Sequence, residues 1–293
     1  MKLQLKVFLY RILCGFFLGI SVVAPGFSGS IVALAMGIYH DLLRIISDPF
    51  KNLKQNVLFC IPVGIGVIVS AALFMLTFRA LFDAYEKAAY LLFVGLVAGN
   101  IPIVSSEVRK NGFKARYIIG AAIAFLAALA AGVFAQGAGM VYDAGAATMS
   151  EWRGLTLGGF LAGVTALIPG MSISTVLILL GIYRPLIYAG EALVRLDLAY
   201  LLPVGLFIIC TIVGLALTAR GIRRIFKKYP GFANTTVLGF VCGSLLGILY
   251  QGLQIDDPSF TWLLGAVMLA VGLGLSILLI FLGKFVNKSD AAE

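Results

Sequence analysis

Serine and glycine residues next to two Pro-Gly pairs are the residues of this chain best suited to bind an anion. Proline lacks an amide hydrogen and clashes with the preceding turn, so each pair should end a helix, and the serine that follows could cap the next one. That next helix presents unpaired N–H groups and a positive dipole end, for which phosphate is the usual ligand. Hydroxyls and closely approaching glycine backbone would add contacts. The predicted binding residues are Pro25, Gly26, Ser28, Gly29, Ser30, Pro169, Gly170, Ser172 and Ser174.

Arginine and tyrosine residues follow each motif and could assist an anion near a membrane surface. Arg44 and Arg184 could attract a phosphate, but they could equally extend to the interface as arginine commonly does. Tyr39 and Tyr183 could line a path, although anchoring at the interface is the more common role of tyrosine. The single histidine, His40, could relay a proton with the adjacent aspartate, so a coupling proton or sodium ion is left open.

Residues for enzyme catalysis are scarce in the apolar segments. No nucleophile lies beside a base, acids are not clustered, and no ATP-type phosphate loop is present. The four cysteines lie singly in apolar segments without ligand or disulfide spacing. The sequence therefore predicts no catalytic residues, no metal site and no cofactor, and it favours transport over catalysis.

Composition indicates a membrane protein. The 293 residues are 61% hydrophobic and 12% charged, with a mean hydropathy of +1.05, whereas soluble domains carry about 25% charged residues. No cleavable signal peptide is evident at the start of the sequence. The net charge of +9 resides mainly in short loops beside apolar runs, which indicates cytoplasmic loops rather than nucleic-acid binding.

Apolar runs recur along the chain, and most are near the length needed to span a bilayer. The predicted segments are 5–24, 28–47, 56–79, 88–104 and 115–137, followed after a Gly-rich linker by 153–168, 172–190, 199–219, 234–251 and 259–285.

The two halves of the chain are related by an internal duplication. At an offset of 144, eight of the fifteen positions from Pro25 to Tyr39 are identical in 169–183. Pro62-Val63-Gly64 matches Pro203-Val204-Gly205 at an offset of 141, which predicts a three-residue deletion between them. Shared Pro-Gly-x-Ser-x-Ser and Gly-Ile-Tyr motifs are not expected from apolar composition alone.

Loop charges predict the orientation of the halves. Basic residues dominate 105–116 and 220–228, whereas acids occur in 138–152 and 252–259. Cytoplasmic basic loops place both termini inside and 138–152 outside. The sequence thus predicts an all-α integral membrane protein with an inverted-topology repeat, two re-entrant broken-helix hairpins and about six full transmembrane helices. Repeat one is 1–137, the outside linker is 138–152 and repeat two is 153–293. If both halves of a hairpin crossed the membrane fully, the two added crossings would leave the orientation of the following segments unchanged.

With both motifs in view, the chain resembles the DUF368 family of bacterial membrane proteins over essentially its whole length. The resemblance implies a translocase, or flippase, that returns undecaprenyl phosphate across the bacterial cytoplasmic membrane for carrier-lipid recycling in cell-envelope synthesis. It implies that the motif residues bind the lipid phosphate within the bilayer. The family tends to have glycine after the motif serine, as at Gly29, but the second copy has Ile173.

Two other functions use similar residues. A secondary transporter of a small soluble anion would need the same helix ends. A membrane lipid phosphatase is the third alternative, because undecaprenyl-pyrophosphate phosphatases also resemble this arrangement. Those enzymes have an arginine between the motif serines, where this chain has Gly29 and Ile173, and this difference argues against catalysis. The sequence does not predict an oligomeric state.

Overall fold

The regular structure of the described chain is helical. The computed structural model describes residues 2–26, 29, 32–33, 36–47, 50–134 and 149–289. Its helices are α1 (Lys2–Val23), α3 (Tyr39–Ser47), α4 (Leu53–Ala98), α5 (Ile101–Asn111), α6 (Ile118–Phe134), α7 (Met149–Ala166), α8 (Ile173–Leu179), α9 (Tyr183–Val194), α10 (Leu201–Lys228), α11 (Pro230–Leu253) and α12 (Trp262–Ser289), with short 3₁₀ turns η1 (Ala115–Tyr117) and η3 (Leu198–Tyr200).

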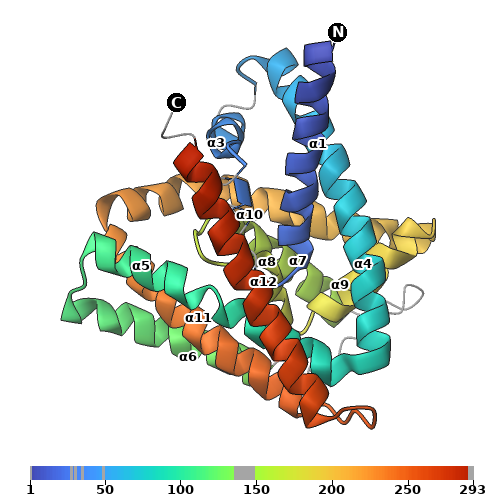
Figure 1. Cartoon of the computed structure of the whole chain (residues 1–293), viewed down its shortest axis with the longest axis vertical. Helices are drawn as coiled ribbons and strands as arrows, with labels where there is room; N and C mark the ends of the chain where they lie inside the picture. The colour runs from blue at the N-terminus through green and yellow to red at the C-terminus, as the bar shows by residue number, and fades with distance from the viewer. Residues whose placement is uncertain are drawn as a thin grey trace.

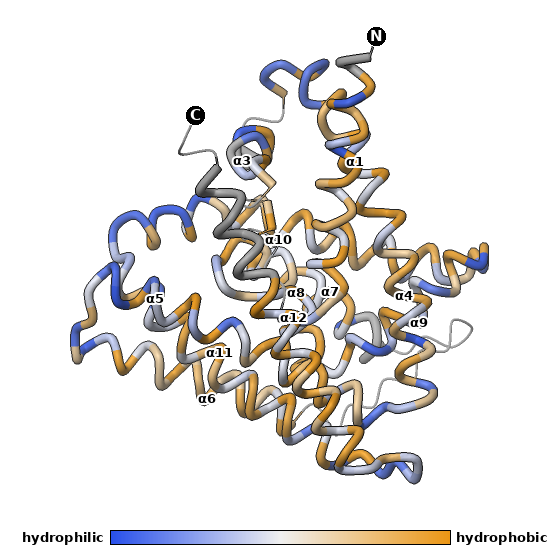
Figure 2. Tube along the Cα trace, in the orientation of Figure 1, coloured by the Kyte–Doolittle hydropathy of each residue, from blue (hydrophilic) through white to orange (hydrophobic). Residues whose placement is uncertain are grey.

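Several of these helices have the length and composition of membrane spans. Within the described residues, five helical segments are long and apolar enough to cross a bilayer, or up to six if a bent pair counts as one span. Figure 2 shows apolar residues along the long helices and hydrophilic residues gathered where the chain turns between them. The expected all-α, multi-pass membrane protein is therefore confirmed.

Helix α4 contains two arms joined at a kink (Figure 1). Its 46 residues would extend about 69 Å as a straight helix, more than twice the hydrocarbon thickness of about 30 Å. The helix bends at Tyr85, whose φ of −149° and ψ of 61° are not helical. Lys87 and Ala84 beside the kink bond to the α11–α12 loop, where Ser259 Oγ donates to Ala84 O over 3.2 Å. The predicted run 88–104 crosses the junction between α4, which ends at Ala98, and α5, which begins at Ile101, and both residues at this junction keep helical φ and ψ.

The predicted run 172–190 is wrong as one segment. It divides into α8 and α9, which are bent by 118° at Gly181. Gly181 has a φ of +71°, a left-handed conformation that glycine adopts readily. The next amide, of Ile182, donates to Leu177 O over 3.0 Å, which is the Schellman pattern that ends a helix.

The same turn ends the corresponding segment of the first half. Gly37 has a φ of +65°, and the amide of Ile38 donates to Ala33 O over 3.0 Å. The predicted run 28–47 is therefore divided as well, with α3 beginning at Tyr39. The duplicated Gly-Ile-Tyr motif thus encodes the same helix end twice.

Glycine contacts pack α1 against α4 and α7 against α10. At each of these glycines, an added Cβ would overlap the backbone of the facing helix, so only glycine permits the observed approach. The facing pairs are Gly15 with Val63 and Gly19 with Val67 in the first half, and Gly159 with Phe207 and Gly163 with Thr211 in the second.

Each glycine contact of the second half lies 144 positions after its counterpart. Val63 and Phe207 are equivalent at this offset, although the repeated Pro-Val-Gly triplets are 141 apart. The predicted three-residue deletion is therefore wrong for these helices, and the Pro62 and Pro203 triplets are not in equivalent positions.

The last helix of each half packs against the other half. Helix α6 lies along α11, and α12 lies along the second arm of α4 (Figure 1). The buried core is accordingly shared, since Phe93 of α4 contacts the ring of Tyr183 of α9 at a centroid distance of 5.6 Å. Because the last helix of each half packs on the other half, the two Pro-Gly segments lie between the halves.

A glycine substitution at a helix contact should destabilise the protein. In Gly163→Ala the new methyl group would overlap the carbonyl of Thr211, and overpacking of this kind costs about 1–3 kcal/mol. We expect thermal unfolding in detergent to shift down by roughly 2–10 °C. Gly205→Ala, where an added Cβ meets nothing within 4 Å, is the matched control and should leave the midpoint unchanged or raise it. Equal midpoints for both variants would contradict this packing.

Candidate functional site

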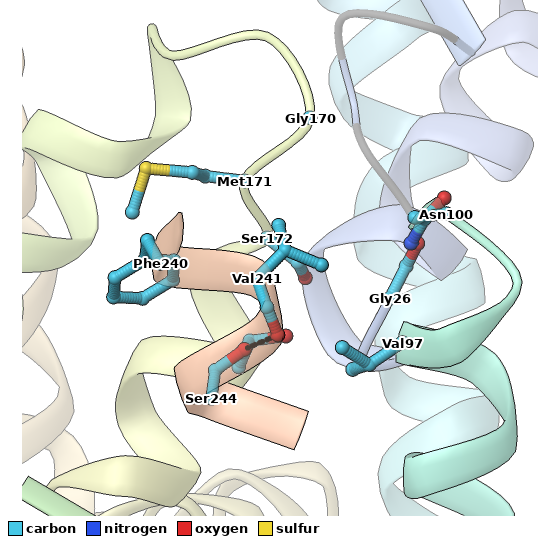
Figure 3. Close-up of a pocket in the computed structure, with 10 residues that line it drawn as sticks. Gly26, Val97, Asn100, Gly170, Met171, Ser172, Phe240, Val241 and Ser244 are labelled. Atoms are coloured by element: carbon cyan, nitrogen blue, oxygen red, sulfur yellow. Dashed lines mark hydrogen bonds between the residues drawn. The ribbon is translucent and has the colours of Figure 1, made fainter. Parts of the chain in front are cut away.

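The two Pro-Gly segments meet at one small cavity between the halves. Helix α1 ends at Val23 and helix α7 ends at Ala166, and each is followed by a turn. In these turns Gly26 has a φ of +81° and Gly170 a φ of +87°, so both need the left-handed conformation that glycine allows. Both glycines line the same cavity (Figure 3).

The cavity wall carries neutral polar groups and apolar side chains. Figure 3 shows Gly26, Val97 and Asn100 on one side, facing Ser172, Val241 and Ser244 on the other. The free space is about 10 Å³, room for about one water molecule. No charged side chain lies among its lining residues, which are Gly26, Val97, Asn100, Gly170, Met171, Ser172, Thr175, Phe240, Val241 and Ser244.

Ser172 and Ser174 lie at the start of α8 and are buried. Ser172 occupies the N-cap position with an extended backbone, but its side chain makes no cap hydrogen bond. Its hydroxyl is instead 3.1 Å from the hydroxyl of Ser174, and the two share a hydrogen bond. The predicted capping by Ser172 is therefore wrong. The hydroxyl of Ser172, which does not cap α8, lies next to the cavity.

The first motif is only partly described. Pro25 is fully buried in its turn, whereas Pro169 in the second turn is exposed. Gly29 lies near Ser21, because a Cβ added to it would be 3.1 Å from the Ser21 hydroxyl. Ser28 and Ser30 lie outside the described residues.

Asn100 and Ser244 are polar lining residues that the sequence reasoning missed. The side-chain amide of Asn100 donates to the carbonyl of Gly26, and so satisfies a backbone group of the first turn. Ser244 is fully buried, and its hydroxyl donates to Val241 O over 2.9 Å. The two residues are 144 positions apart, directly after the paired Gly99 and Gly243. Polar residues at equivalent positions in two apolar runs were the signal that could have identified them.

Thr175 is the third residue that was missed. Its side chain is 3% exposed and lines the cavity. Its hydroxyl makes no hydrogen bond with any described residue. This hydroxyl is therefore available to a ligand in the cavity.

Tyr183 connects the two motifs without lining the cavity. Its ring is buried against Phe82 and Phe93, and its hydroxyl donates to Val23 O over 2.7 Å. Val23 is the last residue of α1 before the first turn. Tyr183 therefore holds the end of α1 against the start of α9.

The other three candidates also lie away from the cavity lining. Arg184 pairs with Glu86 of α4 over 2.6 Å, and the exposed Arg44 pairs with Asp41 in its own helix over 3.1 Å. Tyr39 is partly buried against the cluster around Phe59. Among the described residues, no group of three His, Cys, Asp or Glu side chains could hold a metal ion.

Comparisons with known proteins identify the family of the chain. A family model described as undecaprenyl phosphate translocase-like (VCA0040-like) matches residues 18–256, which include both Pro-Gly motifs. A protein named polyprenyl-phosphate transporter, from Staphylococcus aureus (strain NCTC 8325 / PS 47), is 27% identical over 282 residues, covering 92% of this chain and 95% of that protein. No solved structure matches the chain. The family resemblance inferred from the motifs is confirmed, and the chain belongs to the undecaprenyl phosphate translocase-like family.

Proposed function

We propose that this protein moves undecaprenyl phosphate, or a related polyprenyl phosphate, across the bacterial cytoplasmic membrane. The observation that carries the proposal is the meeting of two broken helix ends at one cavity with neutral hydrogen-bond donors. The family and the name of the S. aureus relative support the substrate class. The protein returns the spent carrier from the outer to the inner leaflet and does not hydrolyse it.

The phosphate group is held by donors rather than by arginines. Ser172 and Thr175 supply hydroxyls at the start of α8, and Ser244 contributes a hydroxyl from the same side of the cavity. Ser174 shares a hydrogen bond with Ser172, and Asn100 holds the turn at Gly26 in place. Ser28 and Ser30 complete the set from the first motif, and the glycines allow the backbone to approach. The oxygens of a phosphate act mainly as acceptors at neutral pH, so hydroxyl and amide donors offset the loss of its hydration.

The cavity must widen before a phosphate can enter. Its free volume of about 10 Å³ corresponds to about one water molecule, which is smaller than a phosphate group. The described arrangement therefore represents a closed state, in which both leaflets are separated from the donors. The polyprenyl chain stays in the bilayer while the headgroup crosses.

An inverted repeat explains how the cavity opens alternately. The equivalent glycine contacts and helix ends, both 144 positions apart, support two copies of one unit. Basic loops on the cytoplasmic side give these copies opposite orientations, with both termini inside and re-entrant motifs entering from opposite leaflets. Repeat one is 1–137 and repeat two is 153–293, joined by the outside linker 138–152.

Loss of the motif hydroxyls should slow transport. In Ser172→Ala/Ser174→Ala, we expect leaflet exchange of a fluorescent polyprenyl phosphate in liposomes to fall about 10-fold or more, because each lost hydrogen bond weakens phosphate binding by about 1–3 kcal/mol. Ser105→Ala, which removes a hydroxyl outside the cavity lining, should match the native protein.

Uptake and release of inorganic phosphate should be followed in the same liposomes. Saturable phosphate uptake without lipid exchange would indicate a soluble-anion transporter instead. Phosphate release from the lipid would indicate a phosphatase. Full exchange in the double serine variant would refute the proposed site.

Removing the side chain of Asn100 should impair transport beyond its effect on stability. Asn100→Ala leaves the carbonyl of Gly26 without this donor, at a cost of about 1–3 kcal/mol in unfolding free energy. Asn56→Ala removes an amide of similar burial that donates to Lys51 O over 3.0 Å, outside the cavity lining. We expect both variants to unfold at lower temperature but only Asn100→Ala to lose lipid exchange per folded protein. Equal transport in the two variants would contradict a role at the site.

A further inference from the structure

A buried carboxylate joins α9 to α4 at the edge of the second motif. The side chain of Glu191 is 1% exposed and forms ion pairs with Arg79 of α4 and with Arg195 at the end of α9. A carboxylate away from water is costly unless it is paired. Arg79 is 112 residues away in the sequence, so this pairing exists only when α9 lies against α4 (Figure 1).

Further polar contacts connect the same two helices. Tyr188 of α9 donates to Asp83, and the guanidinium groups of Arg79 and Arg184 lie 4.8 Å and 5.4 Å from the centre of the Tyr188 ring. Cation–π contacts of this kind strengthen when shielded from water. We call the whole set the α4–α9 network: Arg79, Asp83 and Glu86 of α4 with Arg184, Tyr188, Glu191 and Arg195 of α9.

The position of α9 determines the position of the cavity donors. Helix α9 follows α8 after the tight turn at Gly181, and α8 carries Thr175, which lines the cavity. The turn is fixed by its Schellman hydrogen bonds, so α8 and α9 should move together. Motion of α9 away from α4 would therefore move the donors and open one side of the cavity.

The sequence positions equivalent to the α4–α9 network have a different charge pattern. The positions 144 residues away from the network members carry no acid, and they include four basic residues. Helices α3 and α10, the equivalents of α9 and α4, are not among the described helix pairs in extensive contact. The equivalent residues are Arg223, Lys227 and Pro230 for α4, and His40, Arg44, Ser47 and Lys51 for α9.

We infer that Glu191 is a positioning residue that holds the α8–α9 pair closed on α4 through Arg79 and Arg195. Release of these ion pairs opens the cavity on the α9 side, which is the outer side in the proposed orientation. This inference rests on the proposed transport function. The equivalent positions on the α3 side carry no acid, so no carboxylate there can hold α3 against α10 in the same way.

Accessibility of the cavity tests this inference directly. The reporter is Thr175→Cys, in a background where the four native cysteines are replaced, with labelling by a water-soluble maleimide. Thr175 lines the cavity and is 3% exposed, so labelling requires opening. Glu191→Gln should raise the labelling rate about tenfold or more, because it removes both ion pairs of the buried carboxylate and leaves Arg79 and Arg195, which are 37% and 69% exposed, free to turn to solvent. Glu107→Gln, which removes the exposed pair with Lys110, is the matched control and should not change the rate.

A double-mutant cycle separates gating from general destabilisation. Arg79→Gln should raise labelling in the native background but add little when combined with Glu191→Gln, since both changes remove the same interaction. A labelling rate in the double variant equal to the product of the two single increases would overturn the inference. An unchanged labelling rate in a folded Glu191→Gln variant would also overturn it. If Glu191→Gln does not fold, Arg195→Gln, which removes only one of the two partners, is used as a single variant and should raise the labelling rate by itself.

A reversible cross-link tests the effect of keeping α9 fixed against α4. A Cβ added to Gly190 of α9 would overlap the side chain of Met75 of α4, so Met75→Cys/Gly190→Cys can join the two helices when both cysteines are oxidised. Oxidation should abolish lipid exchange, and a reductant should restore it. Exchange that continues in the cross-linked protein would refute the inference. If the unlinked protein moves no lipid, the proposed function fails, while the maleimide result still decides whether Glu191 holds the cavity closed.

Discussion

Backbone groups inside a bilayer must find hydrogen-bond partners, and this constraint decides where two broken helices can lie. A break after Val23 leaves carbonyl groups that lipid cannot satisfy. The protein supplies partners from distant segments: Tyr183 donates to Val23 O, and Asn100 donates to Gly26 O. The first break is therefore stable only where α9 and the end of α4 meet it. The cavity lies at this meeting point because both halves contribute to it.

Charged and neutral polar groups occupy different places in the molecule. The cavity lining is free of charged side chains, whereas the arginines and acids of the α4–α9 network form ion pairs beside it. An arginine in the cavity would bind phosphate strongly and release it slowly, while neutral donors bind through several weaker hydrogen bonds. A transporter must release its substrate in every cycle. The observed separation is consistent with that requirement.

Close packing by glycine connects these features. Apolar side chains gain little from leaving lipid, so helices in a membrane associate through close backbone contact and polar groups. Gly15 and Gly163, for example, bring α1 onto α4 and α7 onto α10. The last helix of each half then packs on the other half. Movement of one half relative to the other must therefore slide these contacts or bend the chain at turns such as that of Gly170.

Much of this architecture could be predicted from the sequence, because it depends on local chemistry. The Pro-Gly pairs predicted both breaks, and their glycines adopt the left-handed conformation at equivalent positions. The shared Gly-Ile-Tyr motif showed the duplication, but it was not recognised as a helix end, so two runs were predicted too long. Hydropathy predicts that a segment is buried in the membrane. It does not show where a helix of moderate length turns within that layer.

The residues that complete the site depend on tertiary structure alone. Thr175 and Ser244 are ordinary polar residues in apolar runs until folding places them in one wall. Tyr183 has the sequence environment of an interfacial tyrosine, yet it is buried and bonded to a carbonyl 160 residues away. Glu191 pairs with an arginine of the other half. Local sequence determines helix ends and turns, whereas contacts over such separations are decided by how the two halves pack, which no local pattern encodes.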